Sequence, residues 1–462
     1  MNSVFLLLYF AFIFASTFFL RRTKSKEDFL VANRNVNPGL MAMSIAATWI
    51  WAPALFVSAQ QAYQNGWQGL FWFTVPNVAC LLLFIPFAIR FRHRMPHGYT
   101  LSEFMGERYS TRVKGIYLFQ LGMLSLMSTV VQLLAGGKIV ALLTGIPFWA
   151  TSAILGGFCL LYSVSKGIRT SVFTDALQLV IIIGSLAVFV PWVLSKTGVH
   201  AIADGLIGVN GTGMGLFEGN AWNLFLSFGI PTMIGLLSGP FGDQNFWQRT
   251  LTVRKQDIAK SFVLSAILFA SVPILMGTLG FVAAGIGFTP TDPSVVNLEL
   301  LINLLPEWTG VVFTFVVLSG LLSTINSNLS SFSALANDVI KDATIPKLRL
   351  SMTALAVTGI LLSNIPVTII DFFLIYGTLR ASTFATTVLT LADVKLSERG
   401  VLYGVISSLV IGLPLFVWGS LAGEIAIKLA GSVLSLTLSG IVAWVVTRIG
   451  KADHPEKASI IE

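Results

Sequence analysis

The chain has 462 residues, of which 55% are hydrophobic and only 11% are charged, against roughly 25% charged residues in a typical soluble domain. This composition excludes a large soluble domain and predicts a protein that uses lipid as its solvent. The net charge of +8 does not predict a nucleic-acid partner, because the basic residues do not cluster on a polar domain among aromatic side chains.

Thirteen apolar stretches are long enough to cross a hydrocarbon core of about 30 Å as helices. We therefore expect an all-α membrane protein in which residues 1–462 form a single transmembrane domain, with a tail at 449–462. In chain order the expected spans lie at about 3–20, 37–62, 68–90, 115–143, 147–164, 171–195, 222–239, 258–286, 308–336, 349–366, 367–391, 400–420 and 424–447.

The distribution of basic residues predicts the orientation of these spans. Arg21 and Arg22 follow the first apolar stretch, which is the reverse of the charge order in a secretory signal. If the N-terminus lies outside, the inner connections and the tail hold all but four of the 29 Lys and Arg residues. The positive-inside rule then predicts a multi-pass inner-membrane protein with a cytoplasmic C-terminus.

Residue types that support membrane enzymes are missing at membrane depth. Cys80 and Cys159 lie inside apolar runs, and all four histidines fall in polar connections, so neither a metal or haem site nor an enzyme is expected. The glycine-rich stretch GLIGVNGTGMG, at 205–215, lacks the lysine of a phosphate-binding loop. We expect it to be a flexible outer loop.

Two spans carry helix-breaking residues near the middle of the membrane. The second contains SIAATWIWAPA around Pro53, and the seventh contains IGLLSGPFG around Gly239, Pro240 and Gly242. Proline and glycine also simply kink membrane helices. Broken helices five spans apart nevertheless predict two inverted five-helix repeats, at 37–195 and 222–391, with solute and ion held at the breaks.

The ninth span is unusually polar for a membrane helix. Gly320, Ser323 and Thr324 are spaced i, i+3, i+4 and share one face. Two hydroxyl groups beside a glycine form an oxygen-rich surface suited to a small cation, although the same residue types also serve helix packing. Asp175 in the sixth span and Arg380 in the eleventh are intramembrane charges, which usually mark an ion path or a paired charge. The sequence leaves open whether they pair with each other or Arg380 lines the inner exit.

Four ordered motifs resemble the sodium:solute symporter family: KSKEDFLVANRNVNPGL, KGIRTSVFTDALQ, DQNFWQR and LSGLLSTINSNLSSFSALANDV. The resemblance implies a leucine-transporter-type fold, with one helix before a five-plus-five inverted repeat and two after it. It also implies a sodium site built from the backbone carbonyls of Ala47, Ile50 and Gly320 and the hydroxyls of Ser323 and Thr324. Asp175 would be an auxiliary group on the ion path.

The resemblance narrows the function to sodium-coupled symport of a small polar organic solute by alternating access, with urea, amino acids, sugars and organic acids as candidates. Proline carriers of the family have aspartate at Trp49, and the tryptophan-rich segment here is similar to the urea-carrier branch. Proton coupling and a transporter-like membrane sensor are the alternatives. Only about fifteen residues follow the last span, which argues against the output domain that a sensor needs. The candidate solute contacts are Thr48, Trp49, Trp51, Gln132, Ser238 and Tyr376.

Overall fold

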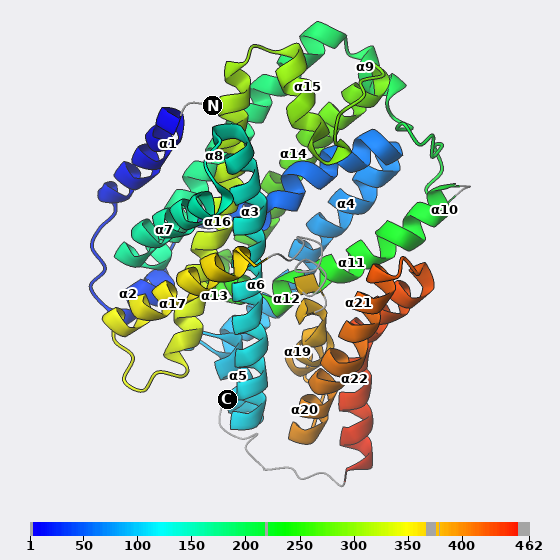
Figure 1. The fold of residues 1–462 in the computed structure, drawn as a ribbon. Coiled ribbons are helices and arrows are strands. Elements are labelled where there is room, and N and C mark those ends of the chain that lie inside the picture. The colour runs from blue at the N-terminus through cyan, green and yellow to red at the C-terminus, as the bar shows by residue number, and fades with distance from the viewer. Residues whose placement is uncertain (1–2, 218–219, 366–375, 378, 451–462) are drawn as a thin grey trace.

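The computed structural model describes residues 3–217, 220–365, 376–377 and 379–450. These residues form helices that gather into one bundle (Figure 1). Ten of the described helices are long and apolar enough to cross a membrane. The expected all-α, multi-pass membrane architecture is therefore confirmed.

The three other expected spans differ from a simple membrane helix. The first is a shorter apolar helix, Val4–Phe19. The second is divided between α3 (Pro38–Trp49) and the beginning of α4 (Ala52–Arg94). The eleventh, at 367–391, lies partly outside the described residues. Residues 451–462 of the expected tail lie outside them as well.

The elements follow one another closely along the chain. The first half comprises α1 (Ser3–Ser16), α2 (Lys26–Val31), α3, α4, α5 (Leu101–Arg108), α6 (Thr111–Thr144), α7 (Phe148–Lys166), α8 (Ile168–Thr197) and α9 (His200–Asp204). The second half comprises α10 (Asn220–Leu224), a π-helical turn (Phe225–Gly229), α11 (Ile230–Leu237), α12 (Gly239–Gly242), α13 (Gln244–Thr252), α14 (Ile258–Gly285), α15 (Val296–Leu304), α16 (Trp308–Asn337), α17 (Ile345–Ser363), α19 (Phe384–Leu391), α20 (Glu398–Ser407), a second π-helical turn (Ser408–Gly412), α21 (Leu413–Leu421) and α22 (Ile425–Ile449).

Helix α4 is a hairpin of two helical segments. Its chain turns at Gly66, whose φ of 62° lies in the left-handed region that favours glycine. A Cβ atom on Gly69 would lie 2.5 Å from the carbonyl oxygen of Gln61, whereas residues eight apart in a straight helix are about 12 Å apart. The segment before Gly66 therefore completes the second span, and the segment after it forms the third.

Helix α16 lies at the centre of the bundle. It packs against α3, α6, α7, α8 and α17 (Figure 1). Helix α1 contacts it as well, because the hydroxyl groups of Tyr9 and Ser319 are 2.9 Å apart. Apart from Asn337 at its end, the serine, threonine and asparagine side chains of α16 are buried among other helices, where polar groups in a membrane protein find partners.

Candidate ion and solute site

The first helix break separates α3 from α4. Ile50 leaves the helical region, with φ −83° and ψ 82°, and Trp51 is extended, with ψ 172°. Pro53, in the first turn of α4, has no N–H group to donate to the carbonyl oxygen of Trp49. Breaks of this kind offer backbone oxygens at membrane depth, where an ion can take them in place of water.

The second break lies beside the glycine and proline residues that indicated it. Helix α12 includes Gly239 and Pro240, and the backbone becomes extended only at Asp243, with φ −117° and ψ 118°. The Asp243 carboxylate accepts a hydrogen bond from the backbone N–H of Asn245 at 3.0 Å and so caps α13. The backbone therefore leaves the helical region at the residue that follows the expected Gly239, Pro240 and Gly242.

The two breaks meet inside the bundle. A Cβ atom on Gly239 would lie 2.3 Å from the ring of Trp49, so only glycine permits this close approach. The Gln120 side chain of α6 donates to the carbonyl oxygens of Gly242, at 3.3 Å, and of Leu379, at 3.0 Å. Gln120 therefore fixes the second break against the chain before Arg380, a role that the sequence analysis missed.

The expected cation ligands lie where the first break contacts α16. The carbonyl oxygen of Ile50 is 3.1 Å from the place where a Cβ atom of Gly320 would stand. Ser323 donates its hydroxyl hydrogen to Asp175 at 2.8 Å, and Thr324 donates to the Gly320 carbonyl at 3.1 Å. Both hydroxyl oxygens keep lone pairs with which to accept a cation. Ala47 is buried in the last turn of α3.

Asp175 forms an ion pair with Arg249 of α13, not with Arg380. The Arg249 guanidinium lies 2.9 Å from the Asp175 carboxylate, and both side chains are fully buried. Ser44 also donates to the carboxylate, at 2.7 Å, and Arg249 donates to Ser327 at 2.6 Å. The sequence analysis did not single out Arg249. The single charge in the otherwise uncharged α13 was the available signal.

Arg380 pairs with Asp243, at 3.1 Å, with side chains only 6% and 8% exposed. Its guanidinium carbon lies 4.1 Å from the ring centre of Tyr376, 5.4 Å from Trp49 and 6.0 Å from Trp51. Aromatic faces attract a cation at these distances. Three of the expected solute contacts thus surround an ion pair that the sequence did not assign.

A cavity of about 180 Å³ begins at this cluster. Its lining includes Trp51, Tyr376 and Arg380, and most of the other lining residues are apolar, such as Phe73 and Phe228. Lys428 also lines it. The cavity offers room for a small molecule beside two aromatic rings and a guanidinium group.

The other expected solute contacts lie elsewhere or bond within their own helix. The Thr48 hydroxyl donates to the Ser44 carbonyl at 2.8 Å and is 2.9 Å from the Ser327 hydroxyl, so it faces α16. The Ser238 hydroxyl donates to carbonyls of its own helix at 3.1 Å. Gln132 is buried in α6.

Known proteins share this sequence pattern and fold. Residues 29–408 match the model of the sodium:solute symporter family. The urea-proton symporter DUR3 of Oryza sativa is 26% identical, over 62% of this chain and 43% of its own length. The sodium/pantothenate symporter of Haemophilus influenzae is 23% identical, over 96% of this chain and 94% of its own. This chain thus spans less than half the length of the urea carriers that it matches.

Two solved structures share the fold. A Na+-coupled sialic acid symporter superimposes with a TM-score of 0.80 at 15% identity, over 97% of both chains. Mhp1, a nucleobase-cation-symport-1 family transporter, gives a TM-score of 0.61 at 15% identity, over 92% of this chain and 96% of its own. With the family match covering most of its length, the chain belongs to the sodium:solute symporter family.

Proposed function

We propose that this protein is a secondary active transporter that couples the inward movement of Na+ to uptake of a small polar organic solute by alternating access. Its N-terminus lies outside and its C-terminus in the cytoplasm, as the distribution of basic residues favours. The membrane potential contributes about 2.3 kcal/mol per elementary charge per 100 mV. One sodium ion per cycle therefore suffices to concentrate a neutral solute.

The observation that carries this proposal is the contact between the first break and α16. Small hard cations prefer oxygen ligands. The Ile50 carbonyl, the Gly320 backbone and the hydroxyls of Ser323 and Thr324 supply such oxygens, and none of them is charged. Arg249 already neutralises the nearby Asp175. A sodium ion is therefore held by neutral oxygens and does not serve as the counter-ion of this carboxylate.

The solute is assigned to the cavity beside the Arg380–Asp243 pair. The guanidinium offers donors, the carboxylate offers acceptors, and Trp51 and Tyr376 offer flat apolar faces. The related proteins are named for urea, pantothenate and spermidine. Urea, amino acids, sugars and organic acids all remain candidates for this chain.

Uptake into proteoliposomes tests the proposal. We expect one member of a panel of urea, proline, glucose and pantothenate to accumulate when Na+ is outside and K+ inside, and not in K+ alone. The double variant Ser323→Ala/Thr324→Ala should lose the sodium dependence. Ser333→Ala is the matched control, because the Ser333 hydroxyl donates only to the Ser330 carbonyl of its own helix, at 2.6 Å. Uptake that is equal in both salts and unchanged in the double variant would refute sodium coupling.

Proton coupling is the second candidate, because Asp175 is a fully buried carboxylate bonded to Ser323. Accumulation driven by an inward pH gradient without Na+, and lost in Asp175→Asn, would favour it. The Arg249 guanidinium stabilises the ionised carboxylate and so favours sodium.

A further inference from the structure

The cavity beside Arg380, the central cavity, carries an excess of positive charge. Arg380 and Lys428 both line it, whereas none of its described lining residues is acidic. Asp243 neutralises Arg380, with 3.1 Å between the guanidinium and the carboxylate. Within the described part of the chain Lys428 forms no ion pair, so its charge is left for a bound molecule.

Lys428 belongs to the first turn of α22 and is half-buried. A positive charge at this position does not stabilise the helix, because the N-terminal end of a helix already carries a partial positive charge. Glu424, one turn earlier, is exposed. Ionisable groups within membrane helices usually face a water-filled cavity and mark the path of a solute. Lys428 therefore has the position of a solute ligand.

The serines that line the central cavity use their hydroxyl hydrogens within their own helices. Ser227, Ser432 and Ser435 each donate to the backbone carbonyl four residues earlier, at 2.7, 2.9 and 2.7 Å. Their oxygens keep lone pairs and so act as acceptors. A ligand that needs strong donors must therefore find them in the charged N–H groups of Lys428 and Arg380.

The remainder of the central cavity favours an apolar body. Phe73, Phe228 and Phe416 line it together with other apolar side chains. Its volume is about 180 Å³, and an apolar cavity of about 150 Å³ is large enough for benzene. A molecule that combines a negative charge with an apolar part the size of one ring therefore fits both the charge and the size of this cavity.

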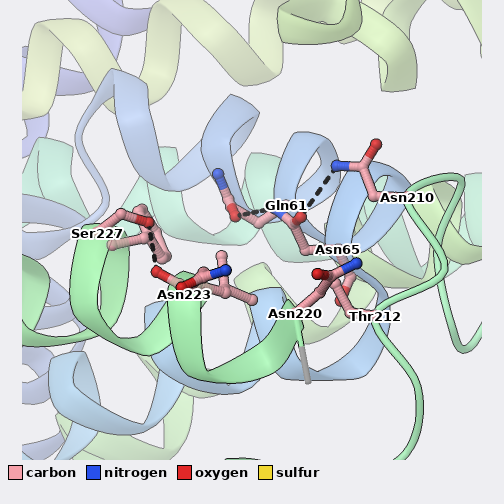
Figure 2. Close-up of a pocket in the computed structure, with 9 residues that line it drawn as sticks. Gln61, Asn65, Asn210, Thr212, Asn220, Asn223 and Ser227 are labelled. Carbon is pink, nitrogen blue, oxygen red and sulfur yellow. Dashed lines mark hydrogen bonds between the residues drawn. The ribbon is translucent and has the colours of Figure 1, made fainter. Parts of the chain in front are cut away.

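The cavity next to the central one carries no charge. This outer cavity, of about 430 Å³, lies between the turn of α4 and the beginning of the seventh span (Figure 2). Its described lining residues are all uncharged, and most of them are amides. Ser227 and Phe228 line both cavities. Selection of a solute by charge is therefore expected in the central cavity and not in the outer one.

The glycine-rich stretch at 205–215 forms part of the outer cavity. Its backbone N–H groups at Val209 and Asn210 donate to carbonyls of the α4 turn, both at 2.9 Å. The Thr212 hydroxyl donates to another carbonyl of this turn, also at 2.9 Å. The stretch expected to be a flexible loop is therefore bonded to α4.

We propose that the transported solute is a small monocarboxylate with an apolar body, and that Lys428 binds its carboxylate and determines this specificity. The proposal rests on the proposed function and deepens it. A hydrogen bond between an ammonium and a carboxylate is stronger than one between neutral groups. An uncharged molecule of the same shape leaves Lys428 without a counter-charge, and an amine adds a third cation to the cavity.

Equilibrium binding to the purified full chain in nanodiscs tests this proposal. The probes are radiolabelled propionate and benzoate, with propionamide and benzamide as uncharged molecules of the same shape and propylamine as a cation. Each probe is measured near neutral pH, in sodium and in potassium buffer.

Three variants separate the charge of Lys428 from its bulk. Lys428→Met removes the charge and keeps a long apolar side chain, whereas Lys428→Arg keeps the charge. Lys196→Met is the matched control, because Lys196 is an exposed lysine that is not among the described lining residues of either cavity.

We expect at least one of the two acids to bind about tenfold more tightly than its amide in sodium buffer, the effect of one hydrogen bond to a charged group. Lys428→Met should remove this preference and leave amide binding unchanged. Lys428→Arg and Lys196→Met should keep the preference. The proposal is overturned if neither acid binds, if the amides or propylamine bind as tightly as the acids, or if the preference survives in Lys428→Met.

The same measurements distinguish this proposal from the proposed function. Binding of an acid that depends on Lys428 but is equal in both buffers, together with no sodium-driven uptake, would refute sodium coupling and leave the selectivity of the cavity in place. Sodium-driven uptake of urea or glucose without binding of either acid would refute the monocarboxylate and leave sodium coupling in place.

Discussion

Two buried ion pairs connect segments that are far apart in the sequence. Asp175 and Arg249 are 74 residues apart, and Asp243 and Arg380 are 137 residues apart. Their charges meet inside the bundle, where desolvation is costly and a charge needs a partner. Arg249 follows the second break, in α13. The other pair joins both breaks, because Asp243 lies at the second and Arg380 lies over the tryptophans of the first.

Arg249→Gln should strongly lower the thermal unfolding midpoint of the purified protein in detergent. Removing one partner of a buried pair typically costs about 3–5 kcal/mol, because the other charge stays buried alone. The double variant Arg249→Gln/Asp175→Asn should recover most of that loss.

Arg254→Gln is the control for this change. Arg254 is 51% exposed and pairs with Asp257 at 2.7 Å, an arrangement worth at most about 1 kcal/mol. If Arg249→Gln lowers the unfolding midpoint no more than Arg254→Gln does, the buried pair does not stabilise the fold.

At the scale of elements, the two broken helices depend on close contact at Gly239. Gly239→Ala should lower both the unfolding midpoint and solute uptake, because its Cβ atom would lie 2.3 Å from the Trp49 ring. Overpacking of this kind costs about 1–3 kcal/mol.

Gly235→Ala makes the same change on the preceding helix, α11, where a Cβ atom meets nothing within 4 Å. It is the control for the unfolding midpoint alone, because Gly235 lines the central cavity. This variant should be neutral or slightly more stable, since alanine favours helix by about 0.5–1 kcal/mol over glycine. Equal effects of the two substitutions would mean that the breaks do not meet as described.

The end of α16 is held to α5 by Asp338. Its carboxylate accepts hydrogen bonds from Thr100 and, at 2.8 Å, from Ser102. Burial raises the pKa of Asp338 from 3.8 to about 6; these two hydroxyl groups and the nearby Lys114 lower it, and Glu103 raises it.

Because the folded protein holds this proton more tightly than the unfolded chain, stability should fall as the pH rises from about 4 to about 6 and then level off. Asp338→Asn should remove that part of the pH dependence, which is about 3 kcal/mol. The check is the unfolding midpoint of both proteins between pH 4 and pH 8. Parallel profiles would contradict the assignment.

At the scale of the whole molecule, most of the membrane fold could be predicted from the sequence. The length of an apolar stretch is almost enough to predict a membrane helix. Pro53 and Gly239 indicated the two broken spans. The exact residue of the second break was less predictable, because the chain leaves the helix at Asp243, whose carboxylate caps the next helix, and a cap is a weaker signal than a proline.

The candidate site was less predictable, because its contacts are long-range. The polar face of α16 was visible as spacing along one helix. The partners of Asp175 and Arg380 could not be predicted, because a single sequence does not show which distant charges meet in the folded protein. Arg249 was missed because a single arginine near other basic residues resembles a positive-inside segment.

The central claim is that a sodium ion binds between the first break and α16. Saturable binding of 22Na+ to the purified protein tests it most directly, because the measurement needs no knowledge of the solute. We predict binding in the wild type and in Ser333→Ala, and its loss in Ser323→Ala/Thr324→Ala. Equal 22Na+ binding by all three proteins, or none by the folded wild type, would contradict this account.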